Sequence, residues 1–334
     1  GPPPLARRSP RPCPPAPAPR GASPPSPGAP RRPLPVGFPP MDNYTELRCI
    51  GGGHHGRAYL VRDRRDGRDY CMKRILVNTF SEAEREAAMQ EVRLLRGLDH
   101  ACVVAYREHF VHGDELCLVM TYCEGGDLAA RVKEAREAGR HFTERQVLDW
   151  FVQIVLALAY CHDNRILHRD LKSQNLFLTR GGRCVCLGDF GIARVLDGSR
   201  AAAQTVVGTP FYMSPEVWQN RPYSYKSDVW ALGCVLYELL ALKQAWDVHN
   251  LLGLVYKIVQ ETYEPPPAHY SQELRDLLAS MLAKDPERRP TMRRILEMPL
   301  IRRALRLIAD GPERADAGAA PARALGAPGA PAAA

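Results

Sequence analysis

The sequence predicts an α+β protein of two lobes, a small β-rich lobe followed by a larger helical one. Residues 44–80 alternate apolar and polar side chains around glycines, which is typical of a meander of strands. Beyond Gly125 and Gly126 the apolar residues recur with the period of a helix, and helices are expected to about residue 305. The change of pattern indicates a hinge near residues 121–126.

Each lobe has one strongly patterned helix. Residues 81–98 have helical periodicity, with Ser81 suited to cap the start and Glu84 three positions further on. Two short strands are expected next, over residues 103–110 and 115–121. Residues 143–162 predict a long amphipathic helix. Its inward face is expected to carry Val147, Phe151, Ile154, Val155 and Leu158. A cleft between two such lobes commonly binds a substrate.

The two ends of the chain carry its charge. Residues 1–40 contain 17 of the 30 prolines, 6 arginines and no acidic residue, and residues 302–334 contain 5 arginines against 3 acidic residues. Together they account for the whole net charge of +8, so residues 41–301 are near neutral and no nucleic-acid partner is indicated. Both ends bury too little apolar surface to order and are expected to be disordered. We expect Met41 to be the natural start of the protein.

Cellular context is indicated only broadly. No apolar run approaches 18 residues and no secretory signal is evident, so no membrane partner is expected. The ten cysteines form no C-x-x-C pair, and Cys184 and Cys186 flank Val185 in a short apolar strand. Reduced, mostly buried thiols in a cytosolic or nuclear protein are the favoured interpretation.

The most informative motif is His168-Arg169-Asp170-Leu171-Lys172-Ser173-Gln174-Asn175, followed by Asp189-Phe190-Gly191. This pattern is typical of the catalytic loop and metal-binding turn of a protein kinase. Phosphoryl transfer needs a group that orients the acceptor hydroxyl, ligands for Mg²⁺ and positive charge near the migrating phosphate. We assign these roles to Asp170, to Asn175 with Asp189, and in part to Lys172. Lys172 and Thr209 favour serine and threonine as acceptors.

ATP is expected to lie between the lobes. Residues 51–56 contain G-x-G-x-x-G between two strands, where glycines let backbone N–H groups approach phosphates. Lys73 stands at the V-A-I-K position and should contact the phosphates, held by Glu91, with Glu86 as the competing partner. Met120 should back the adenine pocket, and the backbone of Thr121 and Cys123 should bind adenine. The full expected ATP contact set is Ile50, Gly51, Gly52, Gly53, His54, His55, Gly56, Ala58, Cys71, Lys73, Met120, Thr121, Cys123 and Phe177.

Two buried carboxylates are expected to brace the large lobe. The segment from Asp189 ends at Glu216, at the A-P-E position, and Glu216 should pair with Arg289. Asp228 should brace the backbone of the catalytic loop.

By these motifs the chain resembles the NIMA-related (NEK) serine/threonine protein kinases. The resemblance rests on HRDLKSQN, LGDFGIAR, VGTPFYMSPE, the hinge Tyr122-Cys123 with GGDL, and YSYKSDVWALGCVLYEL, and it covers residues 44 to about 301. It implies a bilobal kinase fold, Mg-ATP-dependent phosphorylation of proteins and a cytoplasmic, nuclear, centrosomal or ciliary setting.

The resemblance also implies regulation. Thr205 stands where the family is phosphorylated, by an upstream kinase or in trans by another copy, and we expect Arg169 to be a buried cation that receives the phosphate. Tyr106 stands where a tyrosine can block the active arrangement, or it packs with Leu95, His168 and Phe190. His54-His55 departs from the family pattern of a small residue and an aromatic. That departure is the one feature that favours the alternative, a pseudokinase or scaffold module.

Overall fold

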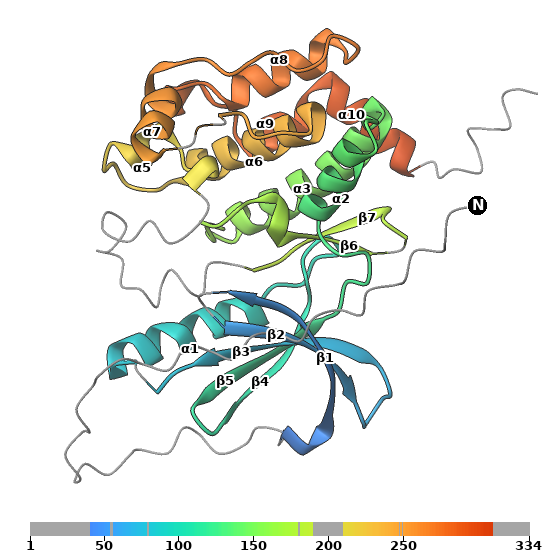
Figure 1. The fold of residues 1–334 in the computed structure, drawn as a ribbon, viewed down its shortest axis with the longest axis vertical. Coiled ribbons are helices and arrows are strands. Elements are labelled where there is room, and N and C mark those ends of the chain that lie inside the picture. The colour runs from blue at the N-terminus through green and yellow to red at the C-terminus, as the bar shows by residue number, and fades with distance from the viewer. Residues whose placement is uncertain are drawn as a thin grey trace, which may run out of the picture.

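The computed structural model describes residues 41–53, 56–78, 80–179, 181–189, 210–246, 248 and 250–309. These residues form two lobes, one built on a sheet and one on helices, as Figure 1 shows. This arrangement confirms the predicted bilobal α+β fold.

The small lobe is a five-stranded antiparallel sheet in the order β1-β2-β3-β5-β4. After a short 3-10 turn at Met41–Asn43, its elements are β1 (Tyr44–Gly53), β2 (Gly56–Asp63), β3 (Asp69–Leu76), α1 (Glu82–Arg96), β4 (Tyr106–His112) and β5 (Glu115–Thr121). The predicted strands and helix are all present. However, β4 begins three residues later than expected, because residues 100–103 form a turn before it.

Burial explains how α1 is held against the sheet. Val92 and Leu95 of α1 are buried in one cluster with Ile75 of β3 and Leu118 of β5. A second cluster, around Tyr70, Met72 and Phe110, covers the opposite side of the sheet. The two faces follow from the alternation of side chains along β3. That alternation also directs Cys71 and Lys73 to the same side as Ile75.

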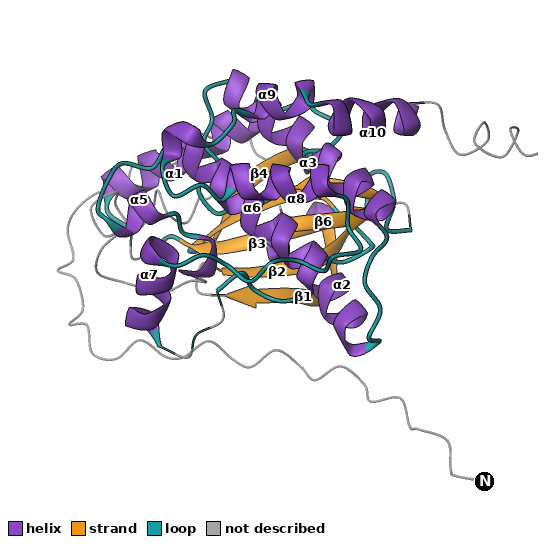
Figure 2. Cartoon of the chain, turned by 90° about the horizontal axis from the view of Figure 1, so that it is seen from above, coloured by secondary structure: helices purple, strands orange, loops and turns teal. Residues whose placement is uncertain are grey.

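The large lobe is helical. Its elements are α2 (Leu128–Glu137), α3 (Glu144–Asp163), η2 (Ser173–Asn175), β6 (Leu176–Thr179), β7 (Cys184–Leu187), η4 (Pro210–Tyr212), α5 (Pro215–Trp218), α6 (Tyr225–Ala241), α7 (Leu251–Gln260), α8 (Gln272–Met281), η5 (Pro286–Arg288), α9 (Met292–Glu297) and α10 (Pro299–Ala309). Seen from above, the helices of the large lobe lie in front of the sheet of the small lobe (Figure 2).

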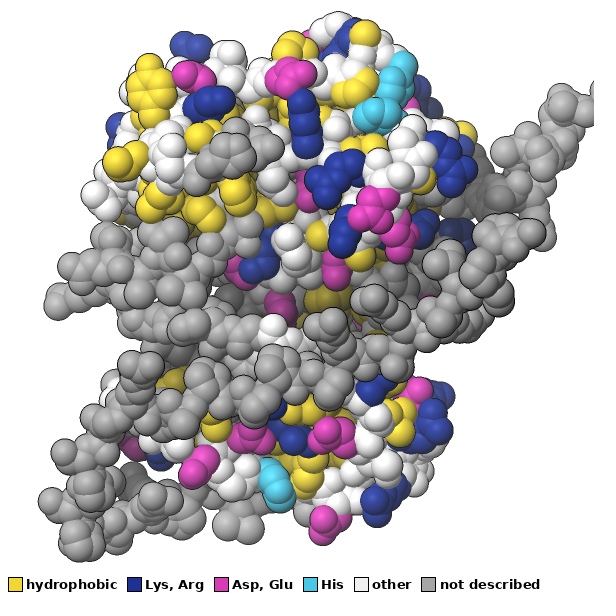
Figure 3. Space-filling model, viewed as in Figure 1, with side chains coloured by type: hydrophobic (Ala, Val, Ile, Leu, Met, Phe, Trp, Pro, Cys, Tyr) yellow, Lys and Arg dark blue, Asp and Glu magenta, His cyan; other side chains and the backbone are white. Residues whose placement is uncertain are grey.

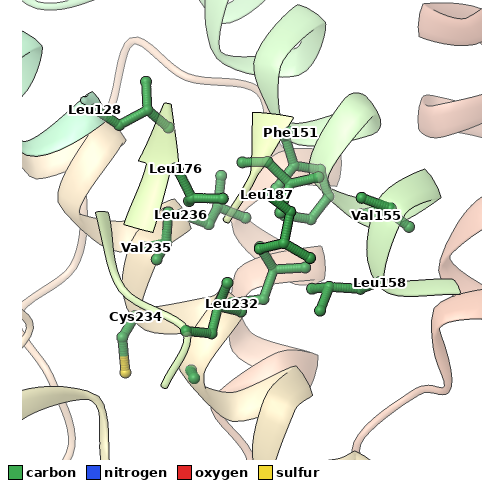
Figure 4. Packing of buried hydrophobic residues seen from close by; sticks show 14 of the residues in the cluster. Leu128, Phe151, Val155, Leu158, Leu176, Leu187, Leu232, Cys234, Val235 and Leu236 are labelled. Atoms are coloured by element: carbon green, nitrogen blue, oxygen red, sulfur yellow. The ribbon is translucent and has the colours of Figure 1, made fainter. Parts of the chain in front are cut away.

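The core of the large lobe lies between α3 and α6. Side chains of α3 such as Phe151 and Leu158 pack with Leu232 and Val235 of α6, and the β6–β7 hairpin adds Leu187 (Figure 4). Helix α6 is buried along almost its whole length from Ser227 onward. A helix that is apolar all round must be central, so α6 is a rigid support for the loops packed on it.

Hydrogen-bonded caps set the ends of these two helices. Thr143 caps α3 by accepting from the N–H of Gln146, so the helix begins at Glu144, one residue after its predicted start. Ser224 caps α6, and the backbone N–H of Ser224 donates a hydrogen bond to the hydroxyl oxygen of Ser227.

The expectation that the chain is disordered from residue 302 onward is wrong for residues 302–309. Helix α10 continues to Ala309, so residues 302–309 are helical and not part of a disordered tail. Ile301 and Ala304 are buried in the core, while Arg302 and Arg303 are exposed. Overall composition concealed this amphipathic segment, because its three arginines were counted with those of the tail that follows. Among the helices the structure describes, none is both long and apolar enough to cross a membrane.

Candidate active site

The catalytic loop is fixed from beneath by Asp228 of α6. This fully buried carboxylate accepts the backbone N–H of His168 at 3.0 Å and that of Arg169 at 3.2 Å, which is the bracing predicted from the sequence. It also accepts from His162 Nε2 at 2.9 Å and from the Tyr223 hydroxyl. Burial raises the pKa of Asp228, but hydrogen bonds and nearby charge, led by His162, outweigh burial and lower it overall. The sequence reasoning missed His162 and Tyr223.

His168 connects the catalytic loop to the turn that carries Asp189. It is fully buried, and its Nε2 lies 3.0 Å from the carbonyl oxygen of Gly188. Burial lowers the pKa of His168, so the ring is neutral near pH 7 and donates this bond. Gly188 also donates its backbone N–H to Asn175 O at 3.0 Å. Two contacts therefore fix the relative positions of the two loops.

Asp170 is held by its two neighbours along the loop. Its Oδ2 accepts from Lys172 Nζ at 2.8 Å and from Asn175 Nδ2 at 2.9 Å. Asn175 donates in addition to the backbone oxygen of Asp170, at 2.7 Å. No described residue is hydrogen-bonded to the other carboxylate oxygen, Oδ1, and the side chain is 32% exposed. One oxygen thus fixes the carboxylate and the other remains available to an acceptor hydroxyl.

Lys73 of β3, in the small lobe, forms an ion pair with Asp189. Its Nζ is 2.8 Å from Asp189 Oδ1. Asp189 has φ +48°, a left-handed conformation that Asp tolerates better than most residues. The predicted partner Glu91 lies on α1, but its side chain is outside the described part of the chain, so that pair stays a prediction.

The oxygen donors at this turn suit Mg²⁺. Asn175 Oδ1 and Asp189 Oδ2 are hard oxygen ligands, and Mg²⁺ is usually held by one or two carboxylates together with phosphate and water. The described residues contain no cluster of three or more His, Cys, Asp or Glu able to hold a metal by themselves. The donor set therefore fits a metal that arrives with a nucleotide and does not fit a protein-only cage.

The glycine-rich loop joins β1 and β2, as its position between strands predicted. Gly53 pairs with Gly56, and Gly51 pairs with Ala58. Gly56 has φ +125°, and a Cβ atom there would lie 2.1 Å from the backbone oxygen of Arg74, so glycine is required. Ile50 and Gly52 lie on β1, and His54 and His55 fall outside the described residues.

The predicted adenine site lies where β3, the hinge and β6 meet. Cys71 is opposite Met120 in the sheet, and Thr121 ends β5. Phe177 of β6 is bridged to Asp127, the cap of α2. Cys71 and Met120 are thus neighbours in the sheet and Phe177 lies beside the cap of α2, while their role in binding adenine stays a prediction.

A thiol pair at this junction was not foreseen. Cys123 of the hinge is hydrogen-bonded to Cys186 of β7, and that bond, together with burial, raises the pKa of Cys123. Burial raises the pKa of Cys71 to about 12. All nine described cysteines are free thiols, in agreement with the expected reduced state. The raised pKa values of Cys71 and Cys123 keep these two thiols protonated and poorly reactive.

The segment from Asp189 to Glu216 is the activation segment, and its end is connected to the large lobe by two polar networks. Glu216 and Arg289 form the predicted ion pair, which is fully buried. Tyr212 of η4 donates to Glu238 of α6 at 2.6 Å and lies 3.0 Å from the Ser173 hydroxyl. This second network, which sequence reasoning missed, connects the segment directly to the catalytic loop.

The predicted regulatory residues have separate outcomes. Arg169 is exposed, so the expectation of a buried cation is wrong: a backbone φ of +66° accompanies an outward side chain. Tyr106 is partly buried against the cluster that contains Leu95, and its hydroxyl is hydrogen-bonded to His109 Nδ1 on the same strand. Thr205, Thr209 and Phe190 lie outside the described residues.

The fold and the arrangement of this site identify the class of protein to which the chain belongs. Residues 44–301 match the family described as protein kinase domain, and the chain belongs to that family. It is 48% identical over 261 residues to serine/threonine-protein kinase Nek1 of Mus musculus, covering 78% of this chain and 21% of that protein. It is 47% identical to Nek4 of Mus musculus (80% and 34% covered) and 44% identical to Nek5 of Homo sapiens (78% and 37% covered).

These similarities place the kinase domain among the NIMA-related serine/threonine kinases. The chain spans between a fifth and two fifths of the length of these three relatives.

Proposed function

We propose that this protein transfers the γ-phosphate of Mg-ATP to serine and threonine of protein substrates. The observation that carries the proposal is the Asp170 carboxylate, whose Oδ2 is held by Lys172 and Asn175 while Oδ1 has no partner among the described residues. A pseudokinase has no need of a carboxylate held in this way.

The roles of the residues follow from their positions. Asp170 Oδ1 orients the acceptor hydroxyl and takes its proton as the hydroxyl oxygen bonds to the γ-phosphorus and the bond from that phosphorus to the departing ADP breaks. Lys172, already beside Asp170, places positive charge where the migrating phosphoryl group passes. Asn175 and Asp189 would hold Mg²⁺, which when bound neutralises phosphate charge.

Lys73 is the proposed ligand of the α and β phosphates. In the structure its ammonium group is bonded to Asp189, on the same side of the sheet as Cys71. To contact the phosphates, Lys73 must either share its ammonium group between Asp189 and the phosphates or leave Asp189. Glu91 is the proposed second carboxylate partner of Lys73. The Lys73–Asp189 pair thus holds both groups near the position where the triphosphate is expected.

Regulation by phosphorylation of Thr205 is part of the proposal. The exposed Arg169 is accessible to a phosphate that comes from outside the loop. A phosphothreonine brings about −1.5 to −2 charges and forms strong bonds to guanidinium groups. The phosphate source is an upstream kinase or a second copy of this chain, and the proposed setting is cytoplasmic, nuclear, centrosomal or ciliary.

Asp170→Asn tests the catalytic proposal directly. The variant should phosphorylate a serine/threonine peptide library about 10²- to 10⁴-fold more slowly than the wild type. Binding of a fluorescent ATP analogue should be retained, because Lys73, Asn175 and Asp189 are unchanged. Asp149→Asn, in an exposed helical ion pair, is the matched control and should keep full activity. Equal rates for wild type and Asp170→Asn would exclude the proposal.

A further inference from the structure

An unusual apolar surface lies on α7. Among the described residues, Leu252 and Tyr256 are the two most exposed large apolar side chains, at 84% and 60%, and Leu251 beside them is 40% exposed. Leu252 and Tyr256 are four positions apart and so share a helix face. We refer to these three residues as the α7 patch. Figure 3 shows hydrophobic side chains gathered on this side of the helical lobe.

The helix that presents the patch is firmly anchored. Its other face buries Leu254 and Ile258 in the core. Asn250 caps the start by accepting from the N–H of Gly253 at 2.7 Å, and Lys284 Nζ donates to Ile258 O at 2.6 Å near the end. The exposed side chains are therefore displayed by a rigid element and do not result from a poorly packed one.

The α7 patch is linked to the catalytic loop through packed elements. Ser173 in the catalytic loop contacts Tyr212 of η4, and three residues later the chain enters α5. Helix α5 packs directly on α7. The helix that carries the patch is therefore packed, through η4 and α5, onto the lobe that carries Asp170.

The size of the α7 patch argues against a stable dimer. Taking about 150–250 Å² for a fully exposed large side chain, its three residues offer about 300–450 Å². A stable interface buries about 800 Å² on each partner. The patch therefore matches a short segment of polypeptide better than the face of a second folded domain.

The segments that flank the described residues contain few large apolar side chains. The apolar residues nearest the described N-terminus, 34–38, end three positions before Met41, which lies in the small lobe, while α7 is in the large one (Figure 1). Three residues span at most about 11 Å. In residues 310–334, Leu325 is the single large apolar side chain. Neither of these flanking segments offers a long apolar run close to α7, which favours an occupant from another molecule.

We propose that the α7 patch docks an apolar segment of the protein substrate, outside the site of phosphorylation. This inference rests on the proposed kinase function and specifies how its substrates are selected. Docking adds affinity for the whole substrate without touching the reacting atoms, so it lowers KM for substrates that carry such a segment and leaves kcat unchanged.

The test uses the full chain with two substrates. β-casein provides an unfolded protein with apolar segments, and a short hydrophilic serine peptide provides an acceptor without one. For the variant Leu252→Ser/Tyr256→Ser we expect KM for β-casein to rise about tenfold, with kcat unchanged and both constants for the short peptide unchanged. Leu307→Ser/Ile308→Ser, which removes two exposed apolar side chains of α10, is the matched control. An unchanged KM for β-casein, or an equal rise in the control, would overturn the proposal.

A binding measurement separates docking from catalysis. Fluorescence anisotropy of labelled β-casein with the Asp170→Asn protein should show the same tenfold loss of affinity on adding the patch substitutions. That loss would support docking even if the wild-type protein showed no phosphoryl transfer. Absence of transfer by the wild type would count against the proposed kinase function and would leave docking unaffected. Equal affinity with and without the patch substitutions, or a dimer in sedimentation velocity that the substitutions abolish, would overturn substrate docking.

Discussion

Arg289 donates two hydrogen bonds of 2.8 Å to the carboxylate of Glu216, although the two residues are 73 positions apart. Its remaining N–H groups donate to the backbone oxygens of Ala283, Lys226 and Lys284. All five guanidinium donors are therefore used. The contact joins the end of the activation segment to α6 and to the loop that follows α8, and it makes this junction dependent on one side chain.

Removing Arg289 should destabilise the whole large lobe. Arg289→Met leaves Glu216 buried without its partner, which should lower the free energy of unfolding by about 3–5 kcal/mol. Urea denaturation measures this loss. Arg293→Met is the control, because Arg293 forms an exposed pair with Asp163 and should cost no more than about 1 kcal/mol. Similar losses in both variants would contradict the importance of burial.

Lys284 should produce a dependence of stability on alkaline pH. Its ammonium group lies 4.8 Å from the ring centre of Trp246, and burial lowers its pKa from 10.5 to about 8. Between these pH values the unfolded chain binds the proton more tightly, so this group's contribution to stability rises with pH. The melting temperature of the wild type should therefore rise relative to that of Lys284→Met between pH 7.5 and pH 10. A constant difference would contradict the lowered pKa.

Thr205 should act as a switch. If its phosphate orders the activation segment through Arg169, Thr205→Ala should reduce activity and phosphatase treatment of the wild type should have the same effect. The measurement is the initial rate of peptide phosphorylation before and after phosphatase. Thr45→Ala, on the far strand β1, is the control. Wild-type rates that do not respond to phosphatase would exclude the switch.

The two histidines of the glycine-rich loop should weaken ATP binding. Replacing His54-His55 with Ser-Phe should lower KM for ATP, because an aromatic side chain can shield the phosphates. An unperturbed histidine has a pKa of about 6.5, so protonated histidines in this loop would attract phosphate at pH 6. The improvement should consequently be larger at pH 8 than at pH 6. Identical KM values for both forms at both pH values would show that the substitution has no effect on nucleotide binding.

The sequence predicted those contacts whose partners occupy motif positions. Asp228 and Glu216 were assigned partners correctly because each stands in a short pattern with a known place in the fold. Cys123 and Cys186, or Tyr212 and Glu238, could not be paired in the same way. They come from elements whose packing brings them together, and no spacing along the chain encodes that contact.

The sequence by itself determined the two-lobed architecture, the catalytic loop and the family, because periodicity and contiguous motifs are local properties of the chain. Only the tertiary structure decided that Lys73 bonds to Asp189, that Arg169 faces outward and that α7 displays Leu252 and Tyr256. In each case the outcome depends on which surfaces pack together and which remain in water. That choice is a balance of burial over the whole molecule, and a short stretch of sequence does not contain it.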